Sequence, residues 1–105
     1  YLMTENLSEH FRLAAKEWVE ADAAANLLEE TKSATLSQKM LALGDMPVSR
    51  AEMTVKASAD WREFLSSMVE ARKAANLLKV KLEWIRMRFS EQQSIEATAR
   101  AERRL

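Results

Sequence analysis

The sequence has no cysteine, and it has one histidine, one glycine and one proline among its 105 residues. Without cysteine there is no disulfide framework, no thiolate metal site and no cysteine nucleophile, which fits a reducing compartment. A single glycine excludes a glycine-rich phosphate-binding loop. So few turn-forming residues also leave little room for a β-sheet with its tight turns.

Further absences bear on catalysis and on membranes. The lone histidine, His10, has only glutamates such as Glu9 close to it in the sequence, so we expect neither a metal site nor a catalytic triad. Adjacent glutamates such as Glu29 and Glu30 fit a charged outer helix face better than a general acid and base. No apolar run approaches the roughly 20 residues that span a bilayer. We therefore predict a cytoplasmic protein that is not an enzyme and has no cofactor.

Helix-forming residues are abundant. Alanine, glutamate, leucine, lysine and arginine dominate a sequence that is 48% hydrophobic and 30% charged, which predicts an all-α protein with a single domain over residues 1–105. The net charge is zero but unevenly spread. Residues 1–45 carry eight acids and four bases, a net charge of −4, whereas residues 46–105 carry eight acids and twelve bases, a net charge of +4. The two halves suit helices that lie side by side.

One segment, LALGDMPVSRAEM, combines the signals for a helix end and a helix start. Gly44 can adopt the left-handed conformation that follows a helix, and Pro47 cannot continue that helix. Ser49 and Glu52 match the capping-box pattern, in which each side chain bonds to a backbone N–H of the other residue. The segment therefore predicts a reversal of the chain.

Apolar residues recur with heptad spacing on both sides of this turn. On the C-terminal side they are Ala57, Trp61, Phe64, Met68, Ala71, Ala75, Leu78, Leu82, Ile85 and Phe89. On the N-terminal side they are Phe11, Ala14, Trp18, Ala21, Ala25 and Leu28. This spacing is typical of an apolar seam along a coiled-coil-like helix that packs on another helix. We predict a first helix over residues 8–43 with a stutter near residues 32–35, a turn over residues 44–49 and a second helix over residues 50–89.

The sequence contains an internal repeat. Residues 19–28 read VEADAAANLL and residues 69–78 read VEARKAANLL, which places identical residues at equivalent seam positions. A long antiparallel hairpin would then set small side chains against large ones, as close packing requires. Three pairs are expected to face each other: Trp18 with Ala75, Ala25 with Met68, and Phe11 with Leu82.

The C-terminal part of the chain allows two arrangements. Ser90 and Gln93 match a second capping-box pattern. The second helix therefore either continues straight to the C-terminus or is followed by a short third helix over residues 91–104. The pattern does not decide between them.

A second apolar stripe lies outside the seam of the second helix. Its residues are Leu77, Val80, Trp84 and Met87. One seam covers only one side of a helix, so this stripe needs another partner. Either a terminal segment folds over it, or two hairpins meet through it in a helical-bundle oligomer. We favour a homodimer, because a two-helix hairpin buries little surface on its own.

Basic residues gather near the C-terminus. They are Lys79, Lys81, Arg86, Arg88, Arg100, Arg103 and Arg104. These seven bases stand against four acids after residue 78, a net charge of +3. Such a patch could contact phosphates while Trp84 stacks on an unpaired base. A basic helix C-terminus is also the ordinary complement to the helix dipole, so nucleic acid is one of two readings of this region.

Two segments carry a family resemblance. WREFLSSMVEARKAANLLKVKLEWIRMRF, residues 61–89, and EATARAERR, residues 96–104, resemble small all-helical proteins of tailed phages and prophages, some of them encoded among recombination and replication genes. The resemblance covers residues 8–105 and contains no diagnostic motif, so it implies a phage or prophage origin but no functional residue. Our leading hypothesis is a non-enzymatic protein that presents a helical surface to a protein partner. The alternative is a nucleic-acid-binding accessory protein of DNA recombination or replication.

Overall fold

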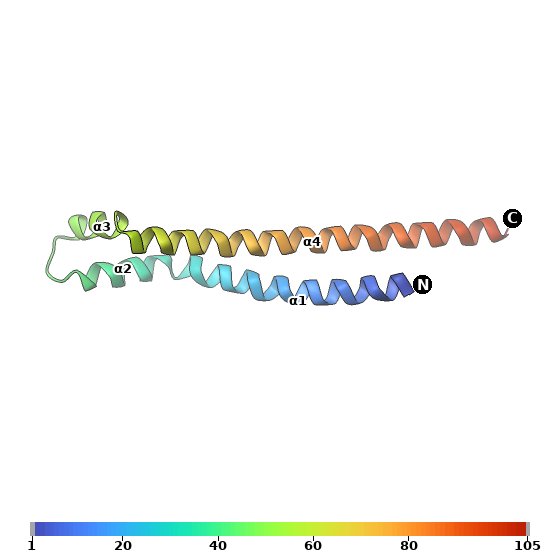
Figure 1. The fold of residues 1–105 in the computed structure, drawn as a ribbon, viewed down its shortest axis with the longest axis horizontal. Coiled ribbons are helices and arrows are strands. Elements are labelled where there is room, and N and C mark those ends of the chain that lie inside the picture. The colour runs from blue at the N-terminus through green and yellow to red at the C-terminus, as the bar shows by residue number, and fades with distance from the viewer. Residues whose placement is uncertain (1, 105) are drawn as a thin grey trace. The chain divides into compact units, whose positions relative to one another are not determined.

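The computed structural model describes residues 2–104 of the chain. Four helices follow one another: α1 (Leu2–Glu30), α2 (Lys32–Ala42), α3 (Val48–Lys56) and α4 (Ala59–Arg104) (Figure 1). Residues 2–104 contain no β-strand, and the chain reverses between α2 and α3, so the predicted all-α helical hairpin is confirmed. The chain divides into two compact units. The first comprises Tyr1–Glu20 and Ala75–Leu105, and the second comprises Ala21–Ala74.

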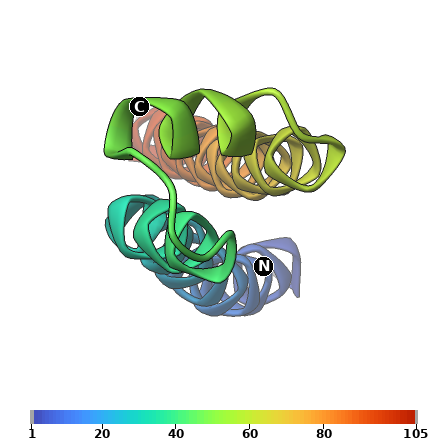
Figure 2. The same ribbon diagram turned by 90° about the vertical axis from the view of Figure 1, so that its left-hand side faces the viewer.

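The reversal lies within the second unit and depends on Gly44. This residue has a φ of +84°, the left-handed conformation that glycine adopts without steric cost. Its backbone N–H donates to the carbonyl of Leu41 at 3.1 Å, which satisfies one of the free carbonyls at the end of α2. α2 and α3 contact each other on the two sides of this turn, as the end-on view shows (Figure 2).

The capping box predicted at Ser49 and Glu52 is wrong. α3 begins earlier, at Val48, with Pro47 at the N-cap and no side-chain hydrogen bond to the cap. Proline suits this place because its φ is already fixed near the required value and it has no N–H that needs a partner. Ser49 therefore lies inside the first turn of the helix, and Glu52 forms an ion pair with Lys56 at 2.7 Å. The turn covers residues 43–47 rather than 44–49.

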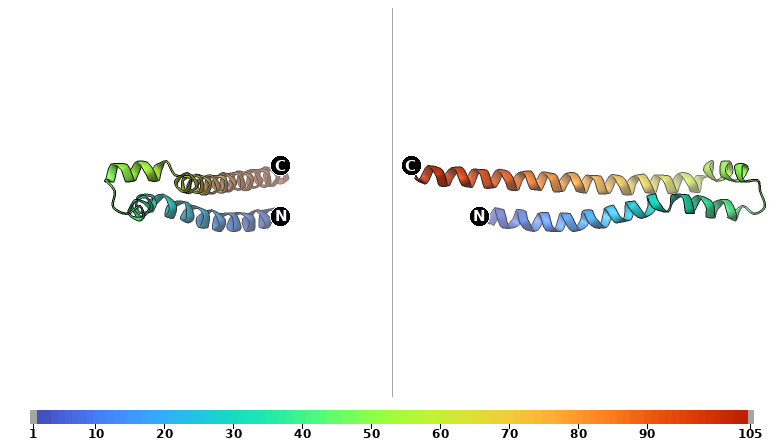
Figure 3. Two further views of the ribbon diagram at one scale, coloured as in Figure 1. Left: turned by 60° about the vertical axis from the view of Figure 1, so that its left-hand side comes forward. Right: turned by 180° about the vertical axis from the view of Figure 1, so that it is seen from behind.

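The second predicted helix is in fact two helices, α3 and α4, separated by Ala57 and Ser58 (Figure 3). Ser58 caps α4, because its hydroxyl oxygen accepts a hydrogen bond from the backbone N–H of Trp61 at 3.2 Å. Asp60 adds a negative charge in the first turn, where the helix dipole favours it. A prediction based on apolar spacing misses this break, because the heptad pattern continues across it.

The first predicted helix also differs from the structure. α1 begins at Leu2, and Thr31 separates α1 from α2 close to the expected stutter. The Thr31 hydroxyl donates to the carbonyl of Leu27 at 2.7 Å, a local bond that often bends helices. Backbone hydrogen bonds still run through the junction, because the Thr31 N–H donates to Leu27 and the Thr35 N–H donates to Thr31.

At the other end of the chain, α4 continues through Ser90 to Arg104. The structure therefore selects the continuous helix, and the alternative of a separate third helix over residues 91–104 is wrong. Ser90 lies exposed within the helix. The surrounding residues are good helix formers, so a weak capping pattern does not interrupt them.

The two predicted seams are confirmed by burial. On α4 the buried residues are Trp61, Ala75, Leu82 and Ile85, and the half-buried ones are Phe64, Met68, Ala71, Leu78 and Phe89. On α1 the buried residues are Ala14 and Ala25, and the half-buried ones are Phe11, Trp18, Ala21 and Leu28. Ala57 is exposed, because it lies in the break before α4 rather than on a helix seam.

Each unit has its own small core. In the first unit Ala14, Leu82 and Ile85 form a buried cluster. Phe11 and Trp18 pack against this cluster. Phe11 therefore packs against the cluster that contains Leu82, the residue predicted to face it. In the second unit the buried residues are Ala25, Ala51, Val55 and Trp61. The rings of Trp61 and Phe64 stack there with centroids 5.3 Å apart.

Candidate functional site

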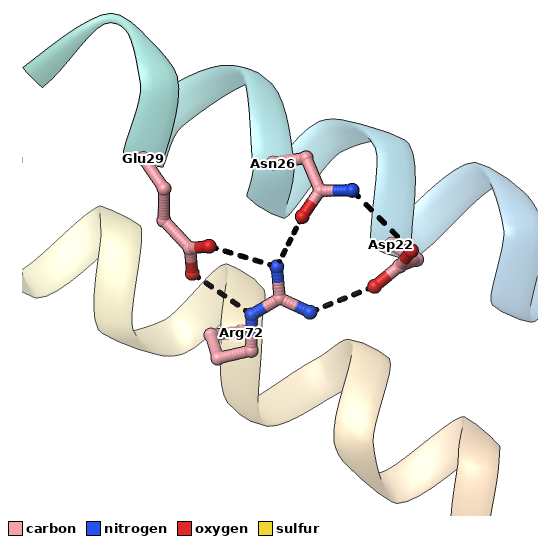
Figure 4. Close-up of polar contacts among 4 residues, drawn as sticks. All are labelled: Asp22, Asn26, Glu29 and Arg72. Atoms are coloured by element: carbon pink, nitrogen blue, oxygen red, sulfur yellow. Dashed lines mark hydrogen bonds and ion pairs between the residues drawn. The ribbon is translucent and has the colours of Figure 1, made fainter.

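A polar network joins α1 to α4 in the second unit (Figure 4). The Arg72 guanidinium donates to Asp22 at 2.7 Å, to Asn26 at 2.6 Å, and to the two carboxylate oxygens of Glu29 at 2.8 and 2.9 Å. Asn26 in turn donates to Asp22 at 3.4 Å. Three side chains on successive turns of α1 therefore hold a single side chain of α4.

The internal repeat explains why this network is possible. Asp22 and Arg72 occupy the same position in the two copies of the repeat, and both are half-buried. The repeats bury equivalent residues alike, since Ala25 and Ala75 are both 0% exposed. In an antiparallel pair of such repeats, the residues at this position face each other, so the same charged residue in both copies would cause repulsion. The chain instead has an acid, Asp22, on α1 and a base, Arg72, on α4, which form an ion pair.

The network also sets the ionisation of its members. The hydrogen bond from Arg72 is the main cause that holds the pKa of Glu29 below its ordinary value of 4.5. The hydrogen bonds that Arg72 donates to Glu29 and then to Asp22 raise the pKa of its guanidinium further above its already high ordinary value. Glu29 and Arg72 each favour the charged form of the other, so the ion pair between them is maintained at neutral pH. The network thus joins α1 to α4 through charge-assisted hydrogen bonds.

The four residues predicted to form an interface all lie exposed on α4. Leu77, Val80, Trp84 and Met87 are between 54% and 62% exposed. With about 100° of rotation per residue, they point roughly 160° away from the seam residues of the same turns. The stripe therefore lies largely away from the seam of α4, and its side chains stay more than half exposed.

Two further apolar residues extend this stripe in both directions. Val69 and Ile95 are 59% and 62% exposed and follow the same helical spacing. The six exposed large apolar side chains within the described part of α4 thus fall on one side of the helix. We call them the outer face of α4: Val69, Leu77, Val80, Trp84, Met87 and Ile95.

Trp84 also borders an open hollow in the first unit. His10, Leu13 and Glu17 of α1 line this hollow of about 300 Å³ together with Lys81 and Trp84 of α4. Leu13 is 45% exposed there, so the apolar surface around Trp84 continues onto α1. His10 is thus a lining residue of a shallow, mixed surface.

A second hollow, of about 290 Å³, lies on the other flank of the same helix pair. It is lined by Leu7, Ser8, Phe11, Ile85, Arg86 and Phe89. The guanidinium of Arg86 lies 5.8 Å from the centroid of the Phe11 ring. One of the seven predicted nucleic-acid contacts therefore already has an aromatic neighbour in α1.

All seven candidate basic residues are exposed on α4. Arg88 lies 5.6 Å from the centroid of the Trp84 ring, and Lys81 lines the hollow beside it. Arg100, Arg103 and Arg104 lie in the last two turns of α4. None of the seven forms an ion pair with another described residue.

Other site chemistry is sparse. Within residues 2–104, histidine and carboxylate side chains do not gather in threes as a metal ion would require. None of the described helices has the length and apolar character needed to cross a membrane. Comparisons with family models, curated proteins and solved structures find no match to this chain. The phage or prophage origin indicated by the sequence therefore stays a prediction.

Proposed function

We propose that this protein is a non-enzymatic helical interaction protein that assembles with itself, and that the outer face of α4 is the surface that another helix covers. The exposure of six large apolar side chains in one line carries this proposal. Burying one such side chain contributes about 1.5–3 kcal/mol, and continuous apolar surfaces of this kind are typical of interaction sites. The seam is already occupied within each unit, so another helix would pack on a different side of α4, and the outer face offers that side.

Light scattering tests the proposal through paired substitutions on the outer face. The native protein is expected at twice the chain mass of 12.0 kDa, and Val80→Glu with Trp84→Glu is expected at 12.0 kDa, because each dimer would bury four added carboxylates. Val19→Glu with Leu27→Glu is the matched control, since these α1 residues are 58% and 62% exposed. A control that dissociates equally, or a native protein of the single-chain mass, would contradict the proposal.

A second candidate function is nucleic-acid binding by the basic region of α4. The observation that favours it is that seven exposed bases have no ion-pair partner among the described residues. Phosphate contacts would compensate their charge.

A gel shift with single- and double-stranded DNA at low and moderate salt tests this function. Binding that survives moderate salt and is lost after five arginines are replaced by glutamine would favour it over self-assembly. These arginines are Arg86, Arg88, Arg100, Arg103 and Arg104. Absence of binding at low salt would remove it.

A further inference from the structure

Charged residues continue the line of the outer face beyond its apolar centre, and their signs differ at the two ends. Arg62 and Lys73 lie toward the N-terminus of α4, and Glu91 and Glu102 lie toward its C-terminus. All four side chains are exposed, and they follow the same spacing of three and four residues. This side of α4 thus has a basic residue on each side of Val69, only apolar residues in the line from Leu77 to Met87, and an acidic residue on each side of Ile95.

We infer that the occupant of the outer face is a second copy of this chain, bound with its α4 antiparallel and with the two-fold axis level with residue 82. This inference rests on the proposed function and specifies its partner. An antiparallel copy brings the basic end of one helix to the acidic end of the other. The facing pairs are then Val80 with Trp84, Leu77 with Met87, Lys73 with Glu91, Val69 with Ile95, and Arg62 with Glu102.

Each pair in this register is complementary in charge or in size. The smaller Val80 meets the larger Trp84, which allows the side chains to interdigitate. Lys73 and Arg62 each meet a glutamate, and the two-fold axis repeats both ion pairs, so four form in the dimer. A parallel copy would instead set Lys73 against Lys73 of the second copy, and Glu91 against Glu91, which is repulsive.

The four charged residues are available for such contacts. Within residues 2–104, no ion pair engages Arg62, Lys73, Glu91 or Glu102. The contact would also be large enough. Residues 62–102 extend over about 60 Å, and a contact roughly 10 Å wide buries about 600 Å² on each copy. The total of roughly 1,200 Å² meets the lower limit for specific, stable interfaces.

A charge exchange tests the register. Lys73→Glu and Glu91→Lys are each expected to weaken dimerisation about tenfold at low salt, because each sets like charges against one another twice. The double variant is expected to return to within about twofold of the native protein, because it restores both ion pairs with their direction reversed. Lys16→Glu, an exposed α1 variant with the same charge change, is the control and is expected to have no effect. Sedimentation velocity gives the dimerisation constants. A double variant as weak as the single variants would overturn the register.

Cysteine cross-linking tests the direction of the helices. The natural chain has no cysteine, so introduced thiols report without background. Ser66 and Thr98 are exposed, continue the outer face and face each other in the antiparallel register. A mixture of Ser66→Cys and Thr98→Cys proteins is expected to form disulfide-linked dimers under mild oxidation, whereas Ser66→Cys alone is not. Linkage of Ser66→Cys to itself would indicate a parallel pair and overturn the inference.

The possible failures are distinguishable. If the native protein is a dimer that Val80→Glu with Trp84→Glu dissociates, but the mixed cysteine proteins do not link, then the antiparallel arrangement is wrong and the proposed function stands. If the native protein has the mass of a single chain, the antiparallel arrangement and the proposed function are both wrong.

Discussion

At the scale of single residues, Arg72 makes the polar contacts between α4 and α1 in the second unit. Its guanidinium contacts Asp22, Asn26 and Glu29, all on α1. Exposed ion pairs contribute little individually, but a bidentate arginine within a network is the geometry in which they contribute most. Because apolar contacts along the seam are not directional, this residue is well placed to fix which helix pairs with which.

Replacing Arg72 with aspartate should lower the melting temperature. The new carboxylate would lie beside Asp22 and Glu29, so attraction becomes repulsion. Circular dichroism at a fixed protein concentration measures the change, and Lys16→Asp is the control, since Lys16 is exposed and lies outside the network. Equal melting temperatures for the native protein and the Arg72 variant would show that the network does not stabilise the fold.

The pH dependence of stability follows from Glu29. Its pKa in the folded protein lies below the ordinary value of 4.5, so the folded state binds this proton less readily than the unfolded state does. The stabilising contribution is therefore complete above pH 4.5 and is lost as the pH falls through the lower pKa of the folded state. We expect the native protein to melt above Glu29→Gln at neutral pH and the difference to shrink in acid. A difference that grows in acid would contradict this assignment.

At the scale of helices, apolar periodicity was the informative signal and also the source of error. It predicted the seams because heptad spacing reports which side chains need burial. It missed the break at Ala57 and Ser58 because that break preserves the spacing. It gave no weight to Ser58 as an N-cap, although a serine followed by Asp60 is an ordinary helix start. A serine inside a periodic apolar segment can therefore still begin a helix.

Substitution of Ser58 by alanine tests the cap. Loss of the hydrogen bond to the Trp61 N–H should lower the free energy of unfolding by about 1 kcal/mol. Ser90→Ala is the matched control, because Ser90 is exposed inside α4 and alanine is the better helix former. Urea unfolding measures both variants. Equal stability losses in the two variants would mean that Ser58 does not cap α4.

The candidate site could be predicted only in part. Leu77, Val80, Trp84 and Met87 were identifiable because they form an unbroken stripe of 3-4 spacing. Val69 and Ile95 escaped because charged residues interrupt the apolar pattern: Lys73 stands between Val69 and Leu77, and Glu91 stands between Met87 and Ile95. The Arg72 network escaped because it depends on the register between two helices, although the exchange of acid for base between the repeats was the visible signal.

At the scale of the whole molecule, α4 has two apolar sides, one buried and one exposed. The seam packs on other helices of the same chain, while the outer face of α4 stays exposed. The side chains that pack within the chain are different from those that are proposed to pack on a second copy. Folding and the proposed assembly therefore depend on different residues. Variants on the outer face should therefore change mass without loss of helix content.

The protein's mass across a range of concentrations tests the proposed self-assembly most directly. Sedimentation equilibrium of the native protein should give a weight-average mass that rises with concentration from the chain mass of 12.0 kDa toward twice that value. A mass of 12.0 kDa at every concentration would contradict the assignment of the outer face of α4 to a second copy of the chain.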